Sequence, residues 1–586
     1  MGYTVNPDLW KLLSESELKW DSGSTVGNKI AGQYELDLAK YEAVQSFADA
    51  RAYSDVAIVT FGTNGGEGDD GDRGEINSLE LGENEKALLE RLDSEGFTVI
   101  ALINSSYVME LGPVMDHADA ILWIGGTGLY GTYGVADLLC GKANPSGRLV
   151  DTYSASSLSS AAMQNFGGYT YANANSEDGT IDGVTIDAAP GDLTKVRYAI
   201  HYLVEEEGVY VGYKYYETRY EDAVLGQGNA DGSAGTYASA DPSAWSYTDE
   251  VVFPFGYGLS YTTFEQTLDS VTYDAASDTY IVTVTVTNTG DKAGKEVVQV
   301  YAQQPYTDFD KANGIEKAAV QLVGFGKTAE LAAGASETVT VTVERKELTS
   351  YDAAVNKTYI LEEGTYYLAV GASAHDAMNN ILAKKGKSVA DGMDADGDAA
   401  KAEEITIEAT DADSYATSVT GYAVTNRFDD SDLNYYGEGL VTWLSRQDWQ
   451  GTWPTSYSEL TATSEMIEDL RNTVGIDSDV FAVIHEMGIL FNGLGNYNPA
   501  GLYIKNDASI TDLSNGLTRD WSNFRSHWEK EYDALNETCM HRFRTRRDVN
   551  QWLIREWQLV TGQFSPISPN RGKYYTIKNN NIKLLH

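Results

Sequence analysis

The stretch Gly62–Glu75, GTNGGEGDDGDRGE, holds the residues best suited to chemistry in this chain. It contains six glycines and five acidic residues in fourteen positions, with Glu67 between two glycines. Glycines let a loop adopt backbone angles that other residues avoid. Clustered carboxylates are costly unless they face water, a cation or a substrate. Taken alone, such a loop is more often a solvated acidic turn than a functional site.

The surrounding sequence predicts a parallel sheet that presents this loop at its ligand-binding edge. Apolar runs expected to be buried strands are Val56–Phe61, Phe97–Asn104 and Asp119–Ile124. They alternate with helical patterns at Lys40–Arg51, Leu81–Asp93, Val108–Met115 and Gly131–Leu139. This alternation is typical of a parallel sheet covered by helices, and the loops after its strands carry ligand sites. Asn104–Ser106 and Gly125–Gly128 follow the other two strands, so three polar tips are expected at one edge.

Composition limits the classes of protein to which the chain can belong. With 586 residues, three or four domains are expected. The formal net charge of −45 argues against nucleic acid and anionic membranes as partners and suits a neutral ligand. Two distant cysteines, Cys140 and Cys539, define no disulfide framework. HEMGIL, His485–Leu490, lacks the second histidine of a zinc helix, and the sequence predicts no metal site and no cofactor.

The sequence contains no recognisable signal for the cellular location of the protein. No apolar run approaches the roughly 18 residues of a transmembrane helix. The start, MGYTVNPDLWKLL, lacks the basic and apolar regions of a signal peptide. Because Tyr3–Pro7 resembles the end of a strand, we expect a chain truncated at its N-terminus. Localisation and oligomeric state stay open.

Three further segments differ in character from the first 265 residues. Short β-branched runs, typical of a β-sandwich, occur at Tyr280–Asn288, Glu296–Ala302, Ala318–Thr328, Ser336–Val343 and Gly364–Gly371. Residues 386–475 begin as an acidic, alanine-rich stretch that we interpret as a solvated linker, followed by an aromatic connector at Phe428–Pro454. The tail, 476–586, is expected to be small and helical. Between residues 516 and 586 it has twelve basic and seven acidic residues, a net of +5.

Several motifs in the first 460 residues resemble glycoside hydrolase family 3. They are VAIVTFGTNGGEGDDGDR, ADLLCGKANPSGRLVDTY, EEGVYVGYKYYET and FPFGYGLSYTTF, followed by VTNTGDKAGKEVVQVY and LVGFGKT. The resemblance implies an α/β-sandwich domain over 1–265 and a fibronectin type III-like domain over 266–385. Both precede, in permuted members of the family, a catalytic TIM barrel. The implied fold is therefore α/β with a mostly parallel sheet, then an all-β sandwich.

The same resemblance implies a chemistry and a role for single residues. Family 3 enzymes hydrolyse glycosides with retention, using a barrel aspartate as nucleophile and a glutamate as general acid/base. It places Glu67 in the acid/base role and predicts that Asp69 and Arg73 contact the substrate. The acidic neighbours Asp69, Asp70 and Asp72 would raise the proton affinity of Glu67, as a general acid requires. The implied substrate is a β-glucoside or oligosaccharide.

No residue of this chain is identified as the nucleophile. About 115 residues follow Leu470, whereas a barrel needs about 200 or more. We therefore expect that this chain contains no barrel. Hydrolysis would then require a barrel domain supplied by another polypeptide. Thr518–Trp521 resembles a nucleophile motif only superficially, because Asp520 follows a polar, turn-rich stretch.

Two alternative functions remain open. HRFRTRRDVNQWLIREWQLVTGQFSP in the tail resembles the third conserved region of Stealth-type sugar-phosphate transferases. The first alternative is a non-catalytic carbohydrate-associated fragment in which Glu67 has no catalytic role. The second is a fragment of a Stealth-type transferase. The charge change near residues 470–480 supports a junction between unrelated segments, which is either a genuine fusion or a gene-prediction artefact.

Overall fold

The computed structural model describes residues 4–15, 37–62, 79–128, 130–177, 180–185, 200–426 and 432–473, with four short strands beyond them. The chain forms two compact units. One comprises Met1–Phe166 with Glu205–Ser456, and the other comprises Gly167–Val204 with Tyr457–His586. Within the described ranges, none of the helices has the length and apolar character needed to cross a membrane.

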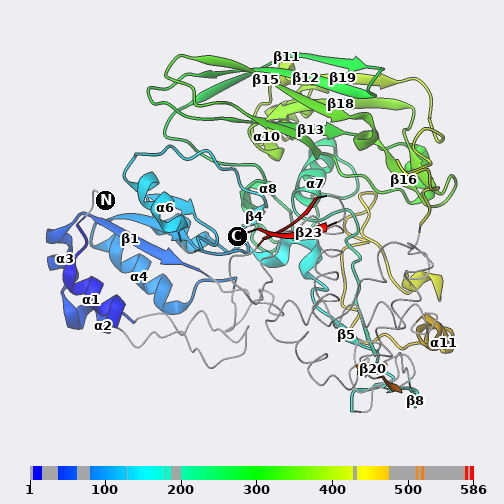
Figure 1. Cartoon of the computed structure of the whole chain (residues 1–586), viewed down its shortest axis with the longest axis horizontal. Coiled ribbons are helices and arrows are strands. Elements are labelled where there is room, and N and C mark those ends of the chain that lie inside the picture. The colour runs from blue at the N-terminus through cyan, green and yellow to red at the C-terminus, as the bar shows by residue number, and fades with distance from the viewer. Residues whose placement is uncertain are drawn as a thin grey trace. The chain divides into compact units, whose positions relative to one another are not determined.

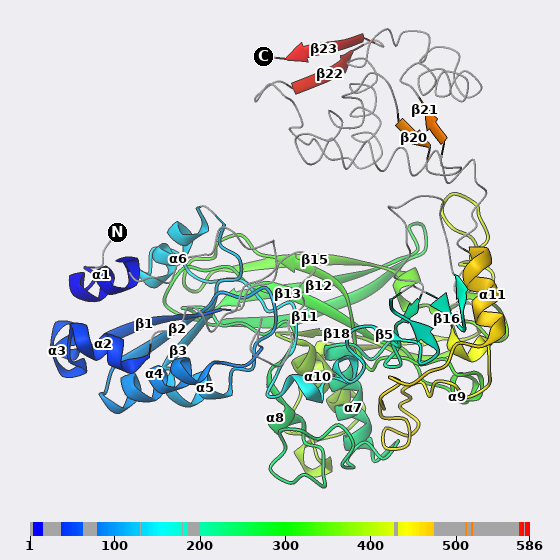
Figure 2. The ribbon, with the colours of Figure 1, turned by 90° about the horizontal axis from the view of Figure 1, so that it is seen from below.

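The first unit begins with the parallel sheet that the sequence predicts. Strands β1 (Val56–Phe61), β2 (Thr98–Ile103) and β3 (Ala120–Trp123) pair in that order, and both pairings are parallel. Helices α4 (Glu83–Ser94) and α5 (Gly112–His117) lie on one side of the strands (Figure 2). Apolar side chains of the strands and these helices form one buried cluster, which positions the strands.

The helices before the sheet differ from the expectation at one point. The sequence predicts a single helix over Lys40–Arg51, but the structure has α2 (Leu38–Val44) and α3 (Phe47–Tyr53). The hydroxyl of Ser46 accepts the backbone N–H of Asp49, which caps a new helix and interrupts the old one. An earlier helix, α1, spans Pro7–Glu15, and α6 occupies the predicted span Gly131–Leu139.

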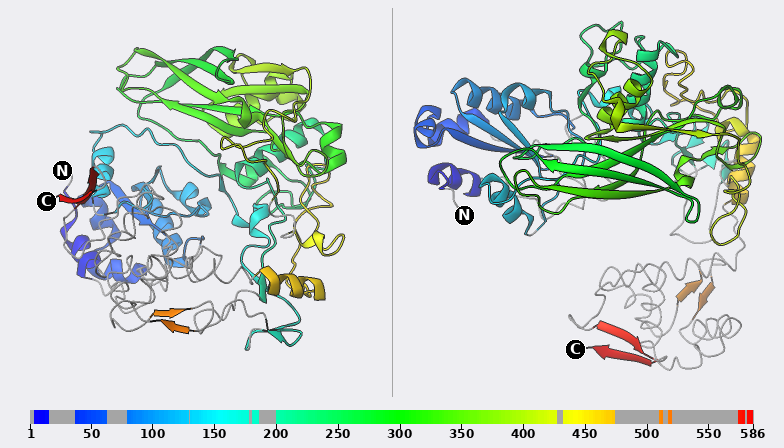
Figure 3. Two further views of the ribbon diagram at one scale, coloured as in Figure 1. Left: turned by 45° about the vertical axis from the view of Figure 1, so that its right-hand side comes forward. Right: turned by 90° about the horizontal axis from the view of Figure 1, so that it is seen from above.

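A β-sandwich follows, as expected, with two sheets seen in Figures 1 and 3. The first contains β11 (Phe264–Asp274), β12 (Thr279–Asn288) and β15 (Ser336–Glu344). The second contains β14 (Gln321–Lys327), β13 (Val297–Gln303), β18 (Gly364–Gly371) and β19 (Ala402–Ile407). Alternate residues of β12 and β15 are buried, so the two sheets enclose an apolar core.

Three helices join the sandwich to the preceding part of this unit. They are α7 (Tyr213–Leu225), α8 (Tyr247–Glu250) and α10 (Ala374–Lys384), and α9 (Asp308–Asn313) lies within the sandwich segment. A single buried cluster contains side chains of α7 and α10 together with Tyr301 and Ala369 of the sandwich. This core therefore crosses residue 265, where the sequence predicts a domain boundary.

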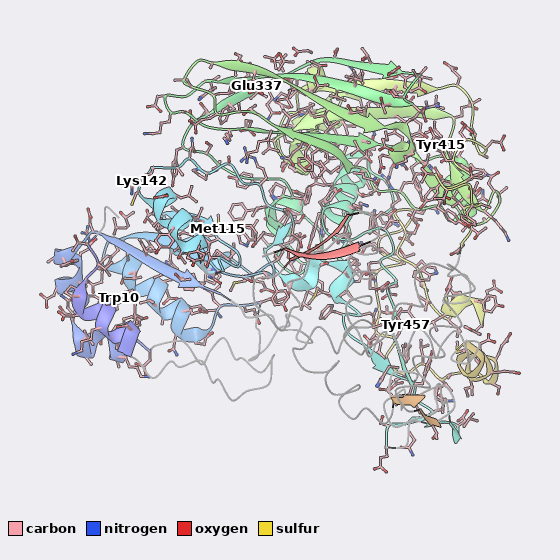
Figure 4. The ribbon with its side chains drawn as sticks, viewed as in Figure 1. Trp10, Met115, Lys142, Glu337, Tyr415 and Tyr457 are labelled. Carbon is pink, nitrogen blue, oxygen red and sulfur yellow. The ribbon has the colours of Figure 1, made fainter. Side chains whose placement is uncertain are left out.

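The interpretation of the acidic stretch after residue 385 as a solvated linker is wrong for residues 402–407, although most of the stretch is exposed. Strand β19 pairs antiparallel with β18 and closes the second sheet of the sandwich. Tyr415, labelled in Figure 4, donates a hydrogen bond of 2.7 Å to Asp278 at the sandwich end. The strand is not predicted because its composition is acidic and its partner strand lies some 35 residues earlier in the chain.

The connector does pack on its neighbour, as expected. Trp449 is fully buried and its indole N–H donates to the Asp222 carboxylate at 2.9 Å. Its backbone N–H donates to the carbonyl oxygen of Gly228 at 2.9 Å. The segment 441–453 is therefore part of the folded core of the first unit.

Small elements complete the described structure. They are β4 (Tyr153–Ser154), β10 (Val251–Phe253), β16 (Ser350–Asp352) and β17 (Thr358–Ile360) in the first unit. The second unit has α11 (Ser464–Thr473) and strands β5 (Tyr169–Thr170), β6 (Ala174–Asn175), β7 (Thr180–Ile181), β8 (Val184–Thr185) and β9 (His201–Tyr202).

The tail differs from the expected helical segment where it is described. Its described residues form two antiparallel hairpins, β20 (Ile510–Asp512) with β21 (Leu517–Arg519) and β22 (Tyr574–Lys578) with β23 (Asn581–Leu585). Asp520 and the rest of the tail lie outside the described residues.

Candidate functional site

The three strand ends that precede the predicted polar tips are neighbours. Because β1, β2 and β3 are parallel, their carboxyl ends lie at the same edge. The backbone N–H of Asn104 donates to the carbonyl of Phe61 at 2.7 Å, and that of Ile124 donates to Ile103 at 2.9 Å. Gly62, Asn104 and Gly125 therefore leave the sheet side by side, which is where ligands bind in such sheets.

Gly62 begins the candidate loop at a place where only glycine fits. A Cβ atom on this residue would lie 2.4 Å from the carbonyl oxygen of Asn104 and 3.3 Å from its carbonyl carbon. Any side chain would have to displace the neighbouring backbone. The first glycine of the motif is thus explained by packing against β2, not by contact with a ligand.

Leu79 marks the return of the chain to the same part of the structure. Its side chain is buried, and its carbonyl oxygen accepts the backbone N–H of Glu110 at 2.7 Å. The Glu110 carboxylate in turn accepts both the N–H and the hydroxyl of Ser157 at 2.8 Å. Glu110 precedes α5 in the connection that leaves β2, so both described anchors of the loop rest on this connection.

The tip of β2 uses part of its polar groups internally. Ser105 is buried; its hydroxyl donates to the carbonyl of Tyr107 at 2.9 Å and accepts the Tyr107 N–H at 3.0 Å. The carbonyl of Ser105 accepts the indole N–H of Trp123 at 3.1 Å. These bonds hold the ends of β2 and β3 together and assign Ser105 a structural role.

The residues predicted to carry the chemistry fall between the two anchors. Glu67, Asp69 and Arg73 lie in the interval 63–78, which is outside the described residues. Their predicted roles stay predictions. Over the part of the chain that the structure does describe, no group of three or more His, Cys, Asp or Glu side chains could hold a metal ion.

Two of the sequence motifs meet in a structural junction away from this edge. The side-chain carbonyl of Asn144 accepts the Ser260 hydroxyl and the Tyr261 N–H, both at 2.8 Å. Its amide donates to the carbonyl of Ala293, between β12 and β13, at 2.9 Å. Arg148 pairs with Glu296 at 2.6 Å, with both side chains largely buried. The GKANPSGR motif therefore ties the sheet-bearing part to the sandwich.

Comparison with known proteins also divides the first unit into a part that contains the parallel sheet and a β-sandwich. Residues 17–261 match the family described as "Glycosyl hydrolase family 3 C-terminal domain". Residues 296–374 match the "Fibronectin type III-like domain". Neither matched range extends into the tail, so the resemblance to Stealth-type transferases receives no support from them.

Similar proteins carry beta-glucosidase names. The chain is 28% identical over 383 residues to a "Beta-glucosidase" of Ruminococcus albus, covering 64% of this chain and 33% of the relative. It is also 28% identical to "Thermostable beta-glucosidase B" of Acetivibrio thermocellus, covering 61% and 39%. A solved beta-glucosidase structure from Paenibacillus barengoltzii has 26% identity and a TM-score of 0.48, covering 69% and 34%.

The chain spans about a third of the length of the curated relatives it matches. What matches is the α/β part with its parallel sheet, followed by the sandwich. Residues 17–261 are therefore similar to the C-terminal domain of glycosyl hydrolase family 3, and in this chain a segment similar to a fibronectin type III-like domain follows them.

Proposed function

We propose that this chain supplies the general acid/base of a retaining, beta-glucosidase-type glycoside hydrolase. One observation carries the proposal most strongly. Gly62, where the loop that contains Glu67 begins, lies at the carboxyl edge of the parallel sheet, and Leu79, just after the loop, is hydrogen-bonded to the connection that leaves β2. That edge is where such sheets bind ligands.

In this proposal Glu67 performs two proton transfers. As an acid it protonates the glycosidic oxygen while the nucleophile attacks the anomeric carbon and forms a glycosyl-enzyme ester. As a base it then takes a proton from the water that hydrolyses this ester. Asp69 and its acidic neighbours favour the protonated form of Glu67 before the first step, because like charges disfavour ionisation. Arg73 and Asp69 contact the sugar.

The nucleophile comes from a barrel domain in another polypeptide or in a longer form of the protein. The substrate class is the β-glucosides and oligosaccharides suggested by the names of the relatives. The share of those relatives that the chain covers is consistent with a division of the active site between two domains. The alternative is a carbohydrate-associated fragment in which Glu67 does no chemistry.

A complementation assay tests the proposal. The purified chain is mixed with an isolated barrel domain of a family 3 enzyme and assayed on 4-nitrophenyl β-glucoside. We expect hydrolysis by the mixture, and a loss of at least about a hundredfold for Glu67→Gln, as general acid–base catalysis contributes typically 10²–10⁴-fold.

The matched control is Glu75→Gln, which removes another carboxylate of the same loop and is expected to stay within a few-fold of wild type. Equal activity of Glu67→Gln and wild type would refute the acid/base role. A mixture without activity would favour the carbohydrate-associated fragment, and activity of the chain alone would refute the divided active site.

A further inference from the structure

Helix α7 buries three carboxylates that its own residues do not neutralise. Glu217, Glu221 and Asp222 are each at most 3% exposed. Buried charges are costly unless they are paired and hydrogen-bonded. Arg219, buried on the same helix, donates instead to the carbonyl oxygens of Ala230 and Gly232, at 2.8 and 3.0 Å. The positive partners must therefore come from other segments.

His375, at the start of α10, supplies the first of these partners. Its Nδ1 lies 2.8 Å from the Glu217 carboxylate, and its Nε2 lies 2.8 Å from that of Asp394. A ring with a carboxylate at both nitrogens donates twice, so it carries both protons and a positive charge. We call Glu217, His375 and Asp394 the latch.

Aromatic side chains enclose the latch. The ring of Tyr247, on α8, stacks on His375 with centroids 3.9 Å apart, and its hydroxyl donates to Glu217 at 2.6 Å. The hydroxyl of Tyr220, on α7, donates to Asp394 at 2.9 Å. Asn379 of α10 also donates to Asp394, at 3.2 Å. Because the Glu217 side chain is fully buried and that of His375 is only 12% exposed, low access to water strengthens the contact between these two most.

The other two carboxylates are neutralised from elsewhere in the chain. Lys385, directly after α10, pairs with Glu221 at 2.6 Å. Arg446, in the connector, pairs with Glu221 at 2.9 Å and with Asp222 at 2.5 Å. All three acidic residues of α7 thus depend on residues 158 to 225 positions later in the sequence.

We infer that the latch couples the family 3 domain to the sandwich, so that α7, α10 and the sheet β13–β18 open and unfold as one cooperative unit. The helices α7 and α10 lie side by side (Figures 1 and 2). Their apolar side chains share one core with Tyr301 of β13 and Ala369 of β18. Apolar contact alone would let the two helices shift slightly against each other. The latch fixes their relative position, because the charge of His375 on α10 must stay next to the carboxylate of Glu217 on α7.

Hydrogen exchange of the full chain, read by mass spectrometry, tests this inference. In the wild-type protein, the slowest amides of α7, α10 and β18 are expected to exchange at a common rate. His375→Gln leaves Glu217 buried without its cation. We expect α7, α10 and β18 to exchange roughly a hundredfold faster as a result, and faster than β12 and β15.

The matched control is His117→Gln. His117 also pairs with a carboxylate, Asp93 at 3.0 Å, but on the surface of the molecule. We expect no change in the exchange of α7 or α10 in this variant.

If His375→Gln does not fold, Asp394→Asn tests the same coupling from the more exposed end of the latch, with a smaller acceleration of about tenfold. Acceleration confined to α10, or exchange of α7 at wild-type rates in the variant that folds, would overturn the inference. A wild-type protein in which α7 and β18 exchange at clearly different rates would overturn it as well.

Discussion

Gly62 shows how a single missing side chain can position a loop. A Cβ atom there would lie 2.4 Å from the carbonyl oxygen of Asn104. We predict that Gly62→Ala lowers the free energy of unfolding by about 1–3 kcal/mol, because the neighbouring strand must shift. Urea denaturation would measure this. Gly112→Ala is the control, since nothing lies within 4 Å of its added Cβ; a similar loss in both variants would contradict the explanation.

His375 predicts a pH dependence of stability. Burial alone would lower the pKa of His375, but the Glu217 and Asp394 carboxylates outweigh it and raise the pKa to about 10. The ordinary value in an unfolded chain is about 6.5. Stability from this group is therefore fully present below about pH 6.5 and is lost as the pH rises toward 10. The groups facing the ring are Glu217, Asp394, Tyr220 and Tyr247.

We predict that the free energy of unfolding, measured with urea at pH 6, 8 and 9.5, falls by a few kcal/mol more in wild type than in His375→Gln. The comparison removes the contribution of other groups that titrate in this range. Parallel curves for the two proteins would contradict the pKa shift of His375.

Elements with local signals were predictable from the sequence, and those with distant partners were not. The apolar run of β1 and the helix α6 have the bounds that their patterns indicate. The strand β19, AEEITI, has too few apolar residues to stand out, and forms because β18 offers it an edge. The split between α2 and α3 had a local signal, the capping serine Ser46, which the apolar pattern outweighed.

The functional and buried polar residues likewise include some that the sequence reveals and some that it does not. The loop could be recognised from its glycines and carboxylates, because type and spacing are visible in the sequence. The latch could not, because Glu217 and His375 are 158 residues apart and have no motif that links them. Nor does the sequence reveal that Ser105, a polar tip of the sheet edge, is buried and satisfied by its own loop.

The connector is an element whose removal should weaken the whole first unit. Trp449 is fully buried, packs on Tyr210 and Tyr215, and donates to Asp222. We predict that Trp449→Ala costs about 3–5 kcal/mol of unfolding free energy, from lost burial and the cavity left behind. Trp443→Ala, at a side chain that is 42% exposed, should cost less than about 1 kcal/mol. A loss below about 1 kcal/mol for Trp449→Ala in urea denaturation would contradict its place in the core.

At the scale of the whole molecule, two matched domains share one core, and the loop proposed to carry the acid/base begins at Gly62, directly after strand β1 of the parallel sheet. The family 3 domain and the sandwich meet through the latch, through Arg446 and through the Asn144 junction. Both domains thus lie within one compact unit and share a buried apolar core in addition to these polar contacts. A rigid support is what a loop needs if it is to meet a nucleophile from another domain.

The acid/base role of Glu67 is tested most directly by identifying the product that the Glu67→Gln chain forms with a family 3 barrel and azide. An acid/base variant of a retaining enzyme accumulates glycosyl-enzyme ester when the leaving group is good, because no base activates water. Azide needs no such base. We predict that, with 2,4-dinitrophenyl β-glucoside as substrate, azide restores turnover to this mixture and β-glucosyl azide appears as the product. Glucose alone as product, at a rate that azide does not change, would contradict it.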